Sequence, residues 1–161
     1  MKEELKNAKK NMKMGMRPYT TYGYYLALPI IFIAIFILGL VGVELDNIGI
    51  ILLVFTVMAN IDASKLTKIS KRKYVAPILV YSQNILGLIL VIPMIITVSS
   101  NGLSEMSLVL VGLVALLTLP IHIVAIIFFF LTANDIKKNY PDMKMLAKEA
   151  RDTYMIIKKS N

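Results

Sequence analysis

The basic residues of this chain are excluded from four long apolar stretches. All 18 Lys and Arg residues fall within residues 1–23, 64–74 and 133–161, whereas the connections at 44–47 and 99–105 carry only acidic charge. A helix of about 20 apolar residues is about 30 Å long, which matches the hydrocarbon core of a bilayer. The pattern therefore predicts an all-α integral membrane protein.

We expect four membrane spans, at residues 24–43, 48–63, 75–98 and 106–132. The charge-free part of the second span is short enough to suit a re-entrant segment as well. A re-entrant segment would, however, place the basic 64–74 connection outside the cell, whereas loops rich in Lys and Arg stay in the cytoplasm. We therefore expect an up-down-up-down four-helix bundle in the cell membrane, with both termini cytoplasmic.

Two segments flank the expected transmembrane domain, which covers residues 19–133. The basic arm at 1–18 has a thin apolar stripe of Leu5, Ala8 and Met12, and we expect it to be solvated and partly disordered. In the tail at 134–161, Pro141 suits a helix start. Apolar residues then recur at the spacing of one helical face: Met143, Leu146, Ala147, Ala150, Tyr154 and Ile157.

The amphipathic tail helix has two readings. It lies on the inner leaflet, where its cations meet anionic headgroups, or its apolar stripe docks onto the cytoplasmic ends of the bundle or onto a partner. We expect the basic side chains near the membrane to contact headgroups; they are Lys65, Lys68, Lys71, Arg72, Lys73, Lys144, Lys148 and Arg151. Because these cations are spread over separate segments at the membrane, topology explains the net charge of +8, and we expect no nucleic-acid partner.

Polar side chains at membrane depth are costly and therefore informative. The third span contains Tyr81, Ser82, Gln83 and Asn84, and the fourth contains His122. Counting from the inner boundaries, Asn84 and His122 both lie about 14–15 Å deep. They form interhelical hydrogen bonds, or they form a site for a proton, a cation or a small ligand with His122 as the titrating group.

The residue types exclude several functions. The chain has no Cys and one His, so thiol catalysis, Cys-based metal sites and multi-histidine metal centres are excluded within one chain. No catalytic or nucleotide-binding motif is present, so we expect neither an enzyme nor a cofactor. The abundance of Ile, Lys and Asn suggests a prokaryotic source.

By elimination, we expect a non-catalytic membrane protein. It would be an accessory or partner subunit of a membrane complex, or an immunity-type protein that engages another membrane-active molecule. The alternative is a homo-oligomeric small channel, holin-like pore or transporter, whose conduction path would use Gln83, Asn84 and His122. The expected partners are the lipid bilayer, chiefly anionic inner-leaflet lipid, and another membrane protein or a second copy of the chain.

Overall fold

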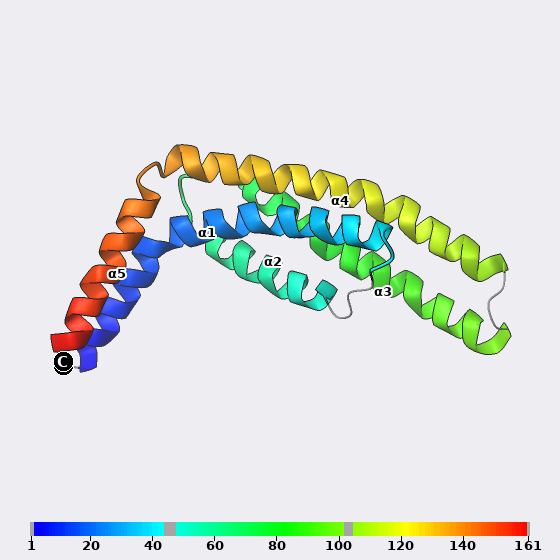
Figure 1. The fold of residues 1–161 in the computed structure, drawn as a ribbon, viewed down its shortest axis with the longest axis horizontal. Coiled ribbons are helices and arrows are strands. Elements are labelled where there is room, and N and C mark those ends of the chain that lie inside the picture. Colours follow the sequence, from blue (N-terminus) through cyan, green and yellow to red (C-terminus); the bar gives the residue numbers. More distant parts are fainter. Residues whose placement is uncertain (1, 44–47, 102–104, 161) are drawn as a thin grey trace.

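The computed structural model of the chain describes residues 2–43, 48–101 and 105–160 (Figure 1). These residues form α1 (Lys2–Leu40), α2 (Ile48–Ser64), the 3-10 helix η1 (Lys71–Tyr74), α3 (Val75–Asn101), α4 (Glu105–Asn139) and α5 (Met143–Ser160). No β-strand occurs in these ranges, and the prediction of an all-helical chain is confirmed.

α1 is one continuous helix, although Pro18 and Pro29 lie inside it. Each proline lacks the backbone N–H that would bond to the carbonyl four residues earlier. Beside the first proline, the Thr21 hydroxyl donates to the carbonyl oxygen of Arg17 at 2.8 Å. Residues 2–18 are helical and run directly into the apolar stretch, so the expectation of a partly disordered arm is wrong.

α1 ends in a glycine-dependent turn. Gly42 has a φ of 79°, the left-handed conformation that a residue without a Cβ adopts most easily. The backbone N–H of Gly42 donates to the carbonyl oxygen of Gly39 at 3.1 Å, and the backbone N–H of Val43 donates to the carbonyl oxygen of Leu38 at 3.0 Å. These two bonds form a Schellman motif, which satisfies carbonyls at the helix end and stops the helix.

The helices pack around α1, which contacts α2, α4 and α5, while α3 pairs with α4. Helices α1 to α4 form an elongated body, and α5 leaves it at an angle beside the N-terminal part of α1 (Figure 1). Alanines at the helix contacts let the backbones approach closely. The buried core includes Tyr25, Leu28, Phe32, Ala59, Ala63, Ala76, Val80, Ala125, Phe129, Ala133 and Ile136.

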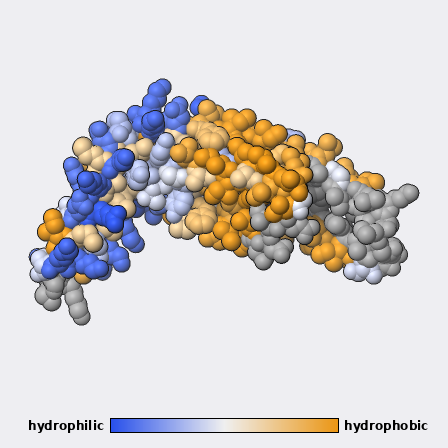
Figure 2. Space-filling model, in the orientation of Figure 1, coloured by the Kyte–Doolittle hydropathy of each residue, from blue (hydrophilic) through white to orange (hydrophobic). Residues whose placement is uncertain are grey.

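The outer surface of the body is apolar. Figure 2 shows apolar residues over the body and hydrophilic residues gathered over α5 and the N-terminal part of α1. Within the described residues, two helices are long and apolar enough to cross a membrane, at Glu3–Leu40 and Leu116–Asn139, and α2 is a shorter apolar helix. Only 22 % of the apolar window in each long helix is buried, whereas the core helix of a soluble protein is mostly buried.

Candidate functional site

Gln83 of α3 and His122 of α4, which we call the polar pair, are in contact. Their closest polar atoms, His122 Nδ1 and Gln83 Oε1, are 3.1 Å apart, and both side chains are partly buried. An amide oxygen only accepts hydrogen bonds, so this contact is a hydrogen bond when Nδ1 carries the proton. The structure thus joins two residues that the sequence predicts at similar depth on neighbouring expected spans.

Phe32 of α1 completes the surroundings of His122. The two rings meet edge to face, with centroids 4.7 Å apart and planes at 78°. Phe32 is itself buried and contacts Phe129 of α4. Sequence reasoning missed Phe32, because an aromatic residue in an apolar span carries no sign of which neighbour it faces.

The other members of the predicted polar cluster do not bond to the polar pair. The side-chain amide of Asn84 donates to the carbonyl of Val80 in its own helix at 2.8 Å. Tyr81 accepts a hydrogen bond at 3.3 Å from the amide of Asn60 in α2. Ser82 is exposed. The predicted cluster of five residues therefore separates into the polar pair, one contact between α2 and α3, and two residues that join neither.

A cavity of about 830 Å³ lies beside the polar pair. Its walls come from α1, α2, α3 and α4, and they include Phe32, Gln83, Asn84 and His122. Gly49 and Gly87 also line it, and a Cβ on either would meet no atom within 4 Å. The amide and imidazole groups of the wall suit hydrogen bonding to an uncharged group, and no group of three His, Asp or Glu residues in the described ranges could hold a metal ion.

Hydrogen bonds at Lys73 hold the basic connection between α2 and α3 against the body. The Tyr25 hydroxyl donates to the Lys73 carbonyl at 2.6 Å, and the Lys73 ammonium donates to the Leu66 carbonyl at 2.6 Å. Lys73 is buried, so the expectation that it contacts headgroups is wrong. The other four predicted basic residues of this connection are exposed: Lys65, Lys68, Lys71 and Arg72.

An ion pair joins α1 to α2 at the same end of the body. Arg17 Nε lies 3.8 Å from Asp62 Oδ1, and both side chains are partly exposed. The local spacing suggests Lys65, one helical turn after Asp62, as the partner. The cross-helix partner could not be inferred from spacing within one helix.

The amphipathic tail helix packs against the N-terminal part of α1. α5 confirms the predicted helix, and its carbonyl-to-amide ladder begins at Asp142, one residue after Pro141. Met143 and Ala147 of the predicted stripe are buried, whereas Leu146 is exposed. The stripe therefore docks on protein, and its partner is the segment that we expected to be solvated.

The two helices approach each other closely at Gly15. A Cβ on Gly15 would lie 2.7 Å from the Cβ of Ala150 in α5. Ala8, on the same side of α1, is buried. The stripe of Leu5, Ala8 and Met12 continues to Gly15 at helical spacing, and this continuation is the signal that could have predicted the docking.

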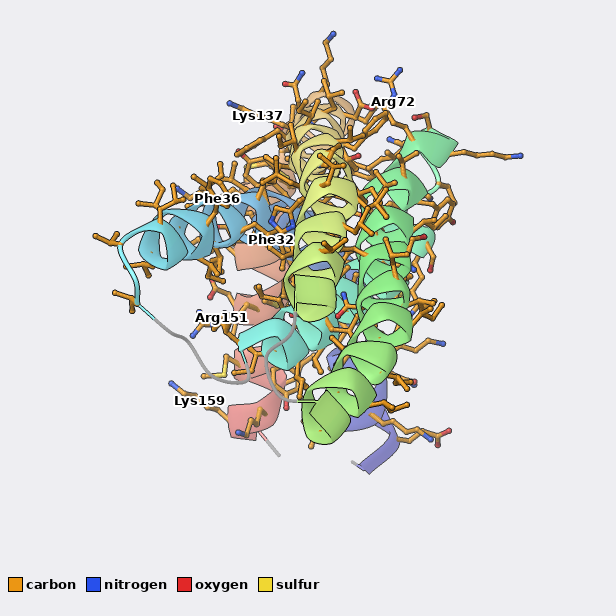
Figure 3. All side chains as sticks on the ribbon, turned by 90° about the vertical axis from the view of Figure 1, so that its right-hand side faces the viewer. Phe32, Phe36, Arg72, Lys137, Arg151 and Lys159 are labelled. Atoms are coloured by element: carbon orange, nitrogen blue, oxygen red, sulfur yellow. The ribbon has the colours of Figure 1, made fainter. Side chains whose placement is uncertain are left out.

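We call residues 2–18 of α1 together with α5 the basic helix pair. Arg17 is partly exposed and pairs with Asp62, and the other cations of the pair whose exposure is described are exposed. The side chains of Arg151 and Lys159 reach away from the ribbon, as do those of Arg72 and Lys137 near the body (Figure 3). The exposed cations of the pair include Lys6, Lys9, Lys10, Lys13, Lys144, Lys148 and Arg151.

No protein-family model matches the chain, and the comparisons with curated proteins and with solved structures return no significant match.

Proposed function

We propose that the chain crosses the cytoplasmic membrane four times, with both termini in the cytoplasm. The apolar and largely unburied surfaces of α1 and α4 support this placement, because lipid would cover what the protein leaves exposed. The confinement of every cation to alternate connections supports the direction. α2 and α3 are the other two spans in this arrangement. The 17 residues of α2 reach about 26 Å, which suits a span with little tilt.

In this membrane we propose a non-catalytic role, as a partner subunit of a membrane complex or an immunity-type protein. The basic helix pair is the observation that carries the proposal. It presents exposed cations on a helix that continues without a break into the first span. Such a rigid connection transmits the position of a bound partner to the membrane body. An acidic surface of another membrane protein complements these cations, and anionic inner-leaflet lipid complements those nearest the bilayer.

The pore or transporter alternative has weaker support. Its conduction path requires Gln83, Asn84 and His122 to face a shared aqueous channel. In a single chain these residues line one cavity, but most of its lining is aliphatic or aromatic, and Gln83 and His122 contact each other. Ion flux into liposomes that contain the purified protein would favour this alternative, particularly if His122→Phe abolished it.

Co-purification in mild detergent tests the proposed role. We expect the unchanged protein to recover a partner in stoichiometric amount, and the triple variant Lys144→Glu, Lys148→Glu, Arg151→Glu to lose it. These three side chains are exposed, so their reversal leaves the packing of α5 intact. The matched control reverses Lys65, Lys68 and Lys71 in the connection between α2 and α3, and it should retain the partner. Recovery of no stoichiometric partner, or equal recovery by the triple variant, contradicts the proposal.

A further inference from the structure

The cavity beside the polar pair has the size of a ligand site. Its volume of about 830 Å³ lies within the range of small-molecule sites, which is roughly 300–1,000 Å³. Gly49 of the α2 wall and Gly87 of the α3 wall add no side chain to the cavity. The cavity is not sealed, and exposed apolar residues stand at its edge, among them Ile33, Phe36, Leu88 and Ile123. On the membrane placement proposed above, this edge faces lipid, so a ligand reaches the cavity from the bilayer.

The chemistry of the walls selects an uncharged ligand. Among the described residues that line the cavity, none carries a charged side chain. An ionised headgroup placed there would lose its hydration without gaining an opposite charge, which is strongly unfavourable. Most of the lining is aliphatic or aromatic, which suits a hydrocarbon chain. The polar groups gather on the α3 and α4 walls, where Gln83, Asn84 and His122 lie.

The polar pair also selects the kind of polar group. When His122 Nδ1 donates to Gln83 Oε1, the neutral imidazole keeps Nε2 as an acceptor. The amide nitrogen of Gln83 keeps its two N–H donors. The pair therefore offers one acceptor, His122 Nε2, on the side of the imidazole away from Gln83. A ligand hydroxyl donates to this acceptor, whereas an ether or an ester has no proton to donate.

We propose that this cavity binds an uncharged long-chain lipid whose polar group is a hydroxyl. Its hydrocarbon chain lies along the apolar walls, and its hydroxyl donates to His122 Nε2, while Gln83 holds the imidazole proton on Nδ1. The proposal rests on the membrane placement and is independent of the identity of any protein partner.

Photolabelling of the purified full chain in mild detergent tests the proposal. Three diazirine probes are compared: a long-chain alcohol, the methyl ether of the same alcohol, and a phosphatidylglycerol with the same chain. We expect the alcohol to label residues that line the cavity, with about tenfold higher apparent affinity than the ether, because the ether lacks one hydrogen bond. The phosphatidylglycerol should label the outer surface and spare the cavity.

Two sets of variants separate the site from nonspecific labelling. Gly87→Leu and Gly49→Leu place a side chain in the cavity without meeting a neighbour at Cβ, and both should reduce cavity labelling about tenfold. Gly112→Leu is the matched control, because this α4 glycine is equally open and lies outside the cavity. Gln83→Leu and His122→Phe should remove the preference for the alcohol over the ether while labelling by both probes continues. A purely structural role of the polar pair would not produce that change.

Three results would overturn the proposal: equal affinity for alcohol and ether in the unchanged protein, cavity labelling by the phosphatidylglycerol at the level of the alcohol, or undiminished labelling in Gly87→Leu. If the protein also resists carbonate extraction from membranes, any of these results contradicts the lipid site and leaves the membrane placement standing. If carbonate releases the protein, the membrane placement is contradicted, and the lipid site with it.

Discussion

Tyr25 joins the first apolar helix to the basic connection between α2 and α3. The sequence identifies it only as an aromatic ring at an expected membrane boundary. In the structure its ring packs edge to face on Phe129 at 5.3 Å, and its hydroxyl bonds to the Lys73 carbonyl. A side chain buried this completely, with 0 % exposure, acts through its protein contacts rather than through headgroups.

Tyr25→Phe should therefore lower the free energy of unfolding by about 1–3 kcal/mol, the cost of leaving a buried carbonyl without its donor. Thermal unfolding in detergent measures the change. Limited proteolysis of the connection between α2 and α3 should become faster, because the hydrogen bond from residue 25 to the Lys73 carbonyl is lost. Tyr19→Phe, at an exposed position on the same helix, is the control and should unfold like the unchanged protein. An unaltered unfolding temperature in Tyr25→Phe would show that the hydrogen bond is not stabilising.

The polar pair allows a quantitative test at the residue scale. A double-mutant cycle of Gln83→Leu with His122→Phe should give a coupling of about 0.6 kcal/mol, with an upper end near 1.7 kcal/mol, as for other interhelical hydrogen bonds in membranes. Asn84 bonds to its own helix, so a cycle of Asn84→Leu with His122→Phe should give a coupling near zero. Equal coupling in the two cycles would contradict the specific contact between Gln83 and His122.

At the scale of elements, apolar periodicity predicts most helix positions. The expected spans at 48–63 and 75–98 coincide closely with Ile48–Ser64 and Val75–Asn101, because turns and charges interrupt the chain there. α4 continues seven residues past the expected end at 132, to Asn139. An apolar run predicts the length of an expected span. The helix itself can be longer, because polar residues also form the backbone hydrogen bonds of a helix.

The basic helix pair shows the limit of this reasoning. Each of its stripes is visible in the sequence, but neither stripe identifies its partner. The glycine at position 15 and the alanine at 150 become informative only when the helices are brought together. The lysine content of residues 1–18 favours a solvated arm, whereas the helical spacing of four small or apolar residues favours a helix that packs on another.

Gly15→Leu should separate the two helices of this pair. A Cβ added at this position would lie 2.7 Å from the Cβ of Ala150, so a larger side chain requires a backbone shift that costs about 1–3 kcal/mol. Protease cleavage within α5 should become several-fold faster. Gly23→Leu is the matched control, since a Cβ there meets nothing within 4 Å. If α5 is cleaved at the same rate in both variants, the helix pair does not form as described.

At the scale of the whole molecule, charge and hydropathy divide the chain in the same way. Cations gather on the basic helix pair, on the connection between α2 and α3 and at the end of α4, and the face of the body seen in Figure 2 is largely apolar. This division could be predicted from the sequence, because it follows from which residues are charged. The cavity could not, because it depends on how four helices are spaced and on two glycines that look ordinary in a span.

The membrane placement is the claim on which the rest of the account depends, and single-cysteine labelling tests it directly. The chain has no Cys, so each introduced thiol is the only one in this protein. A membrane-impermeant maleimide applied to intact cells should label Asp46→Cys. It should label Thr67→Cys and Lys148→Cys only after the cells are lysed. Labelling of Thr67→Cys in intact cells would place the basic connection outside and contradict the four-span arrangement.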